Sequence, residues 1–66
     1  MAELLNQYEA AKALGLSTRT LERLRLTGSG PRFAKLGRRV LYRPVDLEAW
    51  VASRLVASTS EVERAS

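Results

Sequence analysis

The segment Gly28-Ser29-Gly30-Pro31 interrupts the chain more strongly than any other stretch of the sequence. Glycine and proline so close together break regular secondary structure and favour a turn. The residues before this segment must therefore form elements that are separate from those after it. The patterns on its two sides predict two helices before the segment, and a hairpin with one helix after it.

Two short helices are predicted in the first part of the chain. Asn6, followed three residues later by Glu9, has the form of a capping box. A glycine ends this pattern, so the first helix should cover residues 7–14. Ser17 is a good N-cap residue for a second helix over residues 18–27. Two helices joined by a turn of three or four residues that contains glycine are typical of the helix-turn-helix unit.

The second helix has an apolar side and a basic side, because successive residues lie about 100° apart around a helix. Leu21 and Leu24 are the pair that we expect to be buried, and Arg25 lies close to the edge of that side. Side chains near the start of such a helix reach base edges when it enters the major groove of DNA. The exposed side carries Arg19, Glu22, Arg23 and Leu26, with Thr18 and Thr20 beside it near the helix start.

After the Gly-Pro break, the sequence predicts two strands of four residues, 33–36 and 40–43, on either side of Gly37-Arg38-Arg39. A two-stranded hairpin is only marginally stable alone, so it must pack on the helices. The apolar side chains available for this packing are Phe33, Leu36, Val40 and Tyr42.

A third helix is predicted over residues 44–56. Pro44 suits its first turn, and Asp46 complements the positive end of its dipole. Apolar residues then recur at helical spacing, from Leu47 onward through Trp50, Val51 and Leu55. Residues 57–66 are polar, and we expect them to form a disordered tail. The expected organisation is one domain over residues 4–56, followed by this tail.

The charge of the chain is concentrated in its middle. The net charge is +4, but residues 19–43 contain eight basic residues and only one acidic residue, Glu22, which gives this stretch +7 and leaves −3 for the remainder. A cationic middle between acidic ends indicates a surface that binds a polyanion. From charge alone, a polyanion-binding surface and a basic face that is merely solvated are equally favoured. The choice between them depends on geometry.

The composition argues against an enzyme. The 66 residues include no cysteine and no histidine, and we find no glycine-rich phosphate loop and no convincing pair of carboxylates. We therefore expect no catalytic residues, no cofactor and no metal site. No apolar run approaches the roughly 20 residues of a membrane span, and the N-terminus lacks the pattern of a signal peptide. These features predict a soluble protein of the cytoplasm.

Taken in order, the segments resemble the small winged helix-turn-helix proteins related to MerR-type DNA-binding domains. These proteins include excisionases of phages and integrative elements and AlpA-like regulators. The resemblance covers residues 4–55, and it is carried by L-L-N-Q-Y-E-A-A-K-A-L-G-L-S-T-R-T-L and by G-P-R-F-A-K-L-G-R-R-V-L-Y-R-P-V-D-L-E-A-W-V. It implies a mainly helical fold with a small β-hairpin, no cofactor, and double-stranded DNA of the nucleoid as the partner.

The resemblance also implies which residues meet the DNA. The second helix would enter the major groove, and the hairpin would act as a wing beside the backbone or the minor groove. By position, Thr18, Arg19, Thr20 and Arg23 match the recognition helix, Lys35, Arg38 and Arg39 match the wing, and Arg43 matches its base. Glu22 and Arg32 complete the candidate set.

Some residues depart from the family pattern, which commonly has an aromatic residue at the position of Glu22 and an aliphatic residue at that of Arg25. Glu22 either accepts a hydrogen bond from a cytosine amino group, repels phosphate, or pairs with Arg25 or another neighbour. Leu26 contacts either a thymine methyl group or a neighbouring protomer. For Arg25 and Arg43, pairing with acidic residues is the alternative to DNA contact.

The aromatic residues are assigned to the core rather than to stacking on bases, because so small a domain has no others with which to fill itself. They are Tyr8, Phe33, Tyr42 and Trp50. This assignment makes RNA binding the weakest hypothesis.

Two roles on DNA remain open: an excisionase, also called a recombination directionality factor, and an AlpA-like transcriptional regulator. Either role is compatible with self-association side by side on DNA. The alternative from another class is a module that binds an integrase or a polymerase subunit through Leu26 and the tail.

Overall fold

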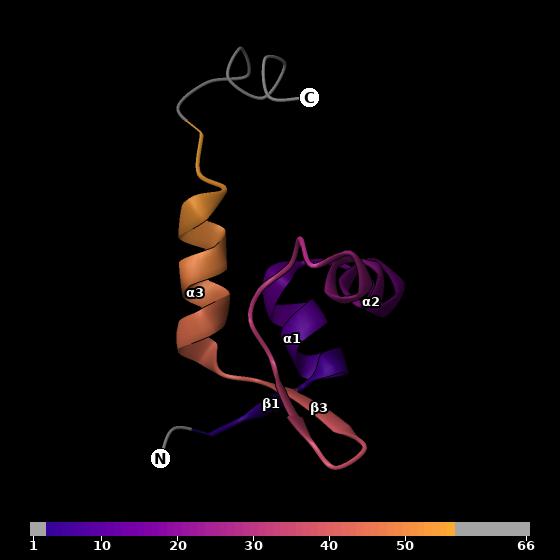
Figure 1. The fold of residues 1–66 in the computed structure, drawn as a ribbon. Coiled ribbons are helices and arrows are strands. Elements are labelled where there is room, and N and C mark those ends of the chain that lie inside the picture. Colours follow the sequence, from indigo (N-terminus) through magenta and orange to yellow (C-terminus); the bar gives the residue numbers. More distant parts are fainter. Residues whose placement is uncertain (1–2, 57–66) are drawn as a thin grey trace.

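The computed structural model describes residues 3–56, which form three helices and a small sheet (Figure 1). The elements are β1 (Leu5–Asn6), α1 (Gln7–Leu14), α2 (Thr18–Thr27), β2 (Ala34–Leu36), β3 (Arg39–Tyr42) and α3 (Pro44–Ser53). In Figure 1, α1 lies between α3 and α2, and the hairpin of β2 and β3 extends away from the helices. The predicted mainly helical fold with a β-hairpin is confirmed. The predicted tail, 57–66, lies outside the described residues.

Local capping interactions determine where the first helix begins and ends. The backbone N–H of Glu9 donates to Asn6 Oδ1 over 2.8 Å, and the N–H of Asn6 donates to Glu9 Oε1 over 3.0 Å. This is the predicted capping box, and it satisfies two donors that the helix start leaves unpaired. Gly15 ends the helix with a φ of +71°, a left-handed conformation that glycine adopts without steric cost. The predicted bounds of α1 are confirmed.

The second helix is capped in a similar way. Ser17 Oγ accepts a hydrogen bond of 3.1 Å from the backbone N–H of Thr20. Gly28 ends the helix in the left-handed region. The predicted span of 18–27 is therefore confirmed, and the short turn between the two helices holds the second helix against the first.

The sheet has three antiparallel strands in the order β1-β3-β2, so β3 is paired on both sides. In the hairpin, Leu36 pairs with Arg39 across a turn at Gly37 and Arg38. The hairpin strands are thus 34–36 and 39–42, rather than the predicted 33–36 and 40–43. Strand β1 was missed altogether, because two residues carry no periodic signal and pair only through the tertiary fold.

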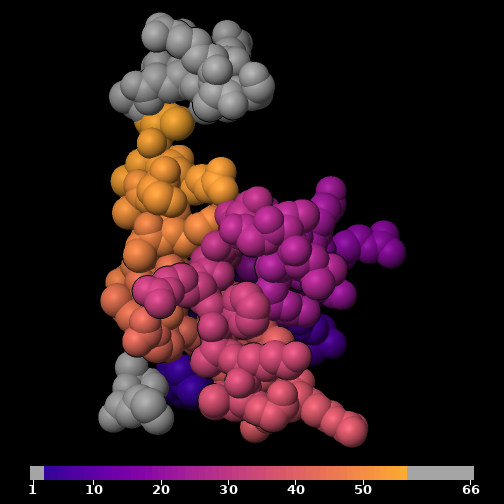
Figure 2. All heavy atoms as spheres, in the orientation of Figure 1, coloured from indigo at the N-terminus to yellow at the C-terminus, as the bar shows by residue number. Residues whose placement is uncertain are grey.

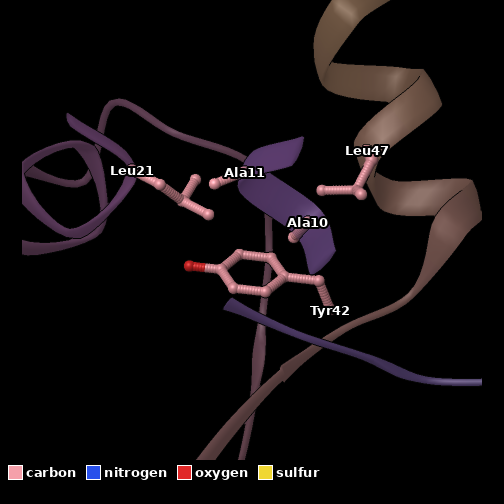
Figure 3. Close-up of a cluster of buried hydrophobic side chains, with 5 residues drawn as sticks. All are labelled: Ala10, Ala11, Leu21, Tyr42 and Leu47. Carbon is pink, nitrogen blue, oxygen red and sulfur yellow. The ribbon is translucent and has the colours of Figure 1, made fainter. Parts of the chain in front are cut away.

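The core lies where α1 approaches α2, α3 and the sheet. Ala10 and Ala11 are both buried on α1, and their small side chains leave room for the larger residues around them. Figure 3 shows the ring of Tyr42 below α1, with Leu21 of α2 on one side and Leu47 of α3 on the other. Tyr42 is fully buried, which confirms its core assignment. Leu24, predicted to be buried with Leu21, is only half-buried.

The remaining aromatic residues are less buried than predicted. Tyr8 is 66% exposed, and its assignment to the core is wrong. It stands two positions before Ala10, about 200° around the helix from the buried side. Phe33 keeps 43% of its surface exposed, and Leu36 keeps 53%. Trp50 is half-buried beside the loop that follows α2.

The third helix is shorter than predicted, ending at Ser53 instead of residue 56. Pro44 occupies its first turn, as predicted. Its apolar stripe is buried at Leu47, but Leu55 is 75% exposed beyond the helix end. No helix within residues 3–56 has the length and apolar character needed to cross a membrane.

Candidate nucleic-acid interface

Helix α2 presents three of its four charged side chains to solvent. Because Leu21 faces the core, Arg19, Glu22 and Arg23 point away from it, and all three are exposed. Three side chains that bear hydrogen-bonding groups are therefore accessible on one exposed surface of α2. The predicted orientation of this helix is confirmed.

The threonines at the start of α2 are half-buried. The hydroxyl of Ser17 donates to Thr20 Oγ1 over 2.9 Å, and Ser17 Oγ in turn accepts from the Thr20 N–H. Thr20 is thus part of the helix cap, while its hydroxyl hydrogen stays available as a donor. No hydrogen bond to the side chain of Thr18 is found among residues 3–56.

The hairpin carries the second group of basic residues. Arg38 lies in the turn, Arg39 begins β3, and Lys35 is the residue of β2 that pairs with Val40. All three basic side chains are exposed. Figure 2 shows long side chains extending from α2 and from the hairpin tip on the same side of the molecule. Side chains of α2 and of the hairpin tip therefore extend from the same side of the molecule.

A hollow separates the hairpin from α2, and Gln7, Arg25, Arg38 and Arg39 are among the residues that line it. Arg25 Nη1 donates a 3.2 Å hydrogen bond to Gln7 Oε1. The Arg25 guanidinium also lies 5.9 Å from the ring centre of Phe33, within the range of a cation–π contact. Within residues 3–56, the partner of Arg25 is a neutral amide, and the predicted alternative of an acidic partner is not found there.

Arg43 has a different environment. Its Nε donates to Asp46 Oδ2 over 2.6 Å and its Nη2 donates to Asp46 Oδ1 over 2.9 Å, which makes a bidentate ion pair. These hydrogen bonds lower the pKa of Asp46 and raise the pKa of Arg43, and the charge of Arg32 lowers the pKa of Asp46 further. For Arg43, the alternative of an acidic partner is confirmed.

Arg32 is exposed in the loop before β2, and it lines a hollow with Phe33, Arg43 and Asp46. Arg32 and Arg43 thus lie near a carboxylate and away from the hairpin tip. The Arg43–Asp46 pair is the one ion pair found between residues 3 and 56, so no ion pair links Glu22 to Arg25 there. The structure groups Arg38 and Arg39 with Arg25, which the sequence had left outside the candidate set.

Leu26 is 76% exposed on the outer side of α2, so both proposed contacts, with a thymine methyl group and with a neighbouring protomer, remain open. Across the described part of the chain, no group of three or more His, Cys, Asp or Glu residues is placed to hold a metal ion.

Comparison with known proteins agrees with this geometry. A family model described as a helix-turn-helix domain matches residues 4–55, which include both basic groups and every described helix and strand. Among curated proteins, none matches the sequence significantly. Since the family model spans most of the chain, the protein belongs to this family of small DNA-binding helix-turn-helix domains, of the excisionase and AlpA-like type.

Proposed function

We propose that the protein binds double-stranded DNA at specific sequences, with α2 in the major groove and the β2–β3 hairpin as a wing on the backbone or in the minor groove. The observation that supports this most strongly is that α2 and the hairpin both expose basic side chains, while long side chains extend from both elements on the same side of the molecule. The major groove, about 12 Å wide, admits one α-helix. The proposal assigns DNA contacts to two arginines on each element: Arg19 and Arg23 on α2, and Arg38 and Arg39 on the wing.

The two elements have different tasks in this proposal. Lys35, Arg38 and Arg39 neutralise phosphates, which supplies most of the affinity and makes binding salt-dependent. The outer side of α2 faces base edges, with Glu22 on it and Thr18 beside it. Each well-placed pair of hydrogen bonds there discriminates against a wrong base by about 1–3 kcal/mol. Glu22 accepts from a cytosine amino group in this arrangement, since it is exposed beside Arg23.

The small size of the domain suggests that several copies act together. A single module of this kind buries about 600–1,000 Å² of protein surface on DNA. Copies bound side by side reach a useful occupancy, and such an array bends or coats an attachment site. We therefore favour an excisionase, or recombination directionality factor, of a phage or integrative element over an AlpA-like transcriptional regulator. Finding an integrase gene beside the gene for this protein would support the first role, and finding that the bound site overlaps a promoter would support the second.

Leu26 favours a second candidate, a module that binds a protein such as an integrase or a polymerase subunit. Leu26 is 76% exposed on the outer surface of α2, so its apolar side chain is accessible to a protein partner. Salt separates the two candidates. Affinity for DNA falls steeply as salt rises, by a slope of about −0.9 in log–log form for each neutralised phosphate. A contact centred on leucine changes little over the same range.

Selection from a pool of random duplexes tests the proposal. The purified protein is mixed with the pool at physiological salt, and bound duplexes are sequenced over successive rounds. Enrichment of a short motif supports specific binding, and evenly spaced direct repeats of it support a head-to-tail array. If no motif is enriched, the basic surface is at most a nonspecific anchor, and the protein-binding candidate takes its place.

A further inference from the structure

We propose that Arg25, Arg38 and Arg39 together form a seat for one backbone phosphate of DNA, in the hollow between α2 and the hairpin. We call these three residues the arginine seat. The inference rests on the proposed function, because it assumes a DNA duplex that spans α2 and the wing. It adds a contact residue, Arg25, and a reason why the wing and the recognition helix bind as one unit.

The position of Arg25 is the first step. Arg25 lines the hollow that contains Gln7, Arg38 and Arg39, and it also lines a neighbouring hollow with Arg32 and Phe33. Its side chain therefore lies between the recognition helix and the hairpin, where a backbone passing from one to the other must run. Arg25 belongs to the same helix as the exposed Arg23, but it projects to the hairpin side of that helix.

The second step is that the side chain of Arg25 is held in place. Gln7 Oε1 accepts its hydrogen bond from one edge, and the ring of Phe33 lies 5.9 Å from the guanidinium. Phe33 in turn contacts Tyr42, with 6.2 Å between ring centres, and Tyr42 is fully buried. The guanidinium is thus connected to the core through two aromatic rings. A long side chain that is already ordered loses less conformational entropy when it binds a ligand.

The third step concerns charge. A guanidinium has five N–H donors, and within residues 3–56 Arg25 uses one of them for a side-chain hydrogen bond, to a neutral amide. Arg43, in contrast, donates twice to the Asp46 carboxylate, so its charge is compensated. No carboxylate among these residues compensates the charge of Arg25, and its contact with Gln7 is partly buried.

The fourth step follows from placing three such groups around one hollow. Arg25, Arg38 and Arg39 place three positive charges around one hollow, and an anion bound between them reduces their mutual repulsion. The planar fork of a guanidinium matches the oxygens of a phosphate group, to which it donates two parallel bonds. A phosphate in the hollow therefore joins α2 to the wing through a shared ligand.

The test uses duplexes that carry the motif enriched in the selection. A series is prepared in which each backbone phosphate in turn is replaced by an uncharged methylphosphonate, and affinity is measured for each duplex. With the wild-type chain, we expect a loss of about ten- to hundredfold at one or two backbone positions, since a hydrogen bond to a charged group contributes about 1.5–3 kcal/mol and each 1.4 kcal/mol is a factor of ten. Arg25→Gln should lose affinity on the unmodified duplex, and a methylphosphonate at those positions should cost it less than it costs the wild-type chain, because only Arg38 and Arg39 still contact the phosphate.

Two further variants control this experiment. Lys12→Gln removes an exposed positive charge from α1, and Lys12 does not line the hollow. It should keep the wild-type profile along the backbone. Gln7→Ala keeps the charge of Arg25 but removes the hydrogen bond that orients its guanidinium. This variant should bind the unmodified duplex severalfold more weakly than the wild-type chain, and methylphosphonates at the same backbone positions should cost it less affinity. It also serves as the test variant if Arg25→Gln fails to fold.

The outcomes are distinguishable. If the wild-type chain enriches no motif, the proposed function fails, and the arginine seat fails with it. If the wild-type chain binds its motif but a folded Arg25→Gln binds equally well, the seat is overturned while the proposed function stands. A parallel titration of inorganic phosphate without DNA identifies a free-anion site. Saturable binding there, with no methylphosphonate position affected by Arg25→Gln, would also overturn the assignment to the DNA backbone.

Discussion

The indole N–H of Trp50 donates a hydrogen bond of 2.9 Å to the carbonyl oxygen of Ser29, across 21 residues of sequence. Arg54 donates to the same oxygen over 2.8 Å and lies over the Trp50 ring. These contacts attach α3 to the loop that follows α2. In that loop, a Cβ added at Gly30 would lie 2.9 Å from Leu24 Cβ, so the chain passes close to α2. The third helix therefore helps to fix the end of α2.

Replacing Trp50 with phenylalanine should destabilise the fold by about 1 kcal/mol, because it removes one net hydrogen bond and leaves Arg54 to satisfy the carbonyl. Chemical unfolding followed by circular dichroism measures this change without relying on tryptophan fluorescence. Val45→Ala, at a residue of α3 that is 59% exposed, is the control and should change stability little. Equal stability of Trp50→Phe and wild type would show that the hydrogen bond to Ser29 contributes nothing.

Replacing Tyr42 with phenylalanine should leave the fold as stable as it is, or stabilise it by up to about 1 kcal/mol, because burying an unpaired hydroxyl is costly. The hydroxyl is buried and has no hydrogen-bond partner among the residues that the structure describes. Tyr8→Phe removes a hydroxyl from an exposed ring and should have no effect. A loss of more than about 1 kcal/mol in Tyr42→Phe would mean that the hydroxyl has a favourable partner in solution.

The Arg43–Asp46 ion pair should make stability fall in acid. The hydrogen bonds from Arg43 hold the pKa of Asp46 in the folded chain below its ordinary value of 3.8. The stabilising effect is therefore fully present above that value, and it is lost as the pH falls through the lower folded-state pKa. Asp46→Asn should flatten the dependence of the unfolding midpoint on pH across this window. The measurement is thermal unfolding between neutral pH and the acid range.

Glu48→Gln is the matched control for this series, because it removes a carboxylate from the same helix without touching the ion pair. Its acid dependence should stay close to that of the wild-type chain. If Asp46→Asn and wild type lose stability in parallel on acidification, the ion pair is not the source of the acid dependence.

Local signals explain what the sequence predicted well. The bounds of α1 and α2 depend on Asn6, Ser17 and the two glycines that follow the helices, all of which act within a few residues. The exposure of Arg19 and Arg23 follows from the helical period alone. Such features need no knowledge of the tertiary fold.

Tertiary contacts explain what the sequence did not predict. Strand β1 exists because Leu5 meets Tyr42, and no pattern in two residues announces that pairing. Tyr8 is exposed because alanines, rather than the larger ring, fill the contact surface of α1. The environment of Arg25 depends on Gln7, 18 residues earlier, and on Phe33 in the loop before the hairpin. The one sequence feature that indicated this environment was the position of Arg25 at the edge of the buried side of the helix.

The central claim is that α2 recognises bases while the hairpin holds the backbone. Arg23→Ala and Arg38→Ala separate these tasks, because both residues are exposed arginines on different elements. The measurement is the affinity of each variant for the selected duplex and for a scrambled duplex of the same composition. Arg23→Ala should lose about 1–3 kcal/mol on the selected duplex and much less on the scrambled one, whereas Arg38→Ala should weaken both alike. Equal losses on both duplexes for Arg23→Ala would contradict the claim.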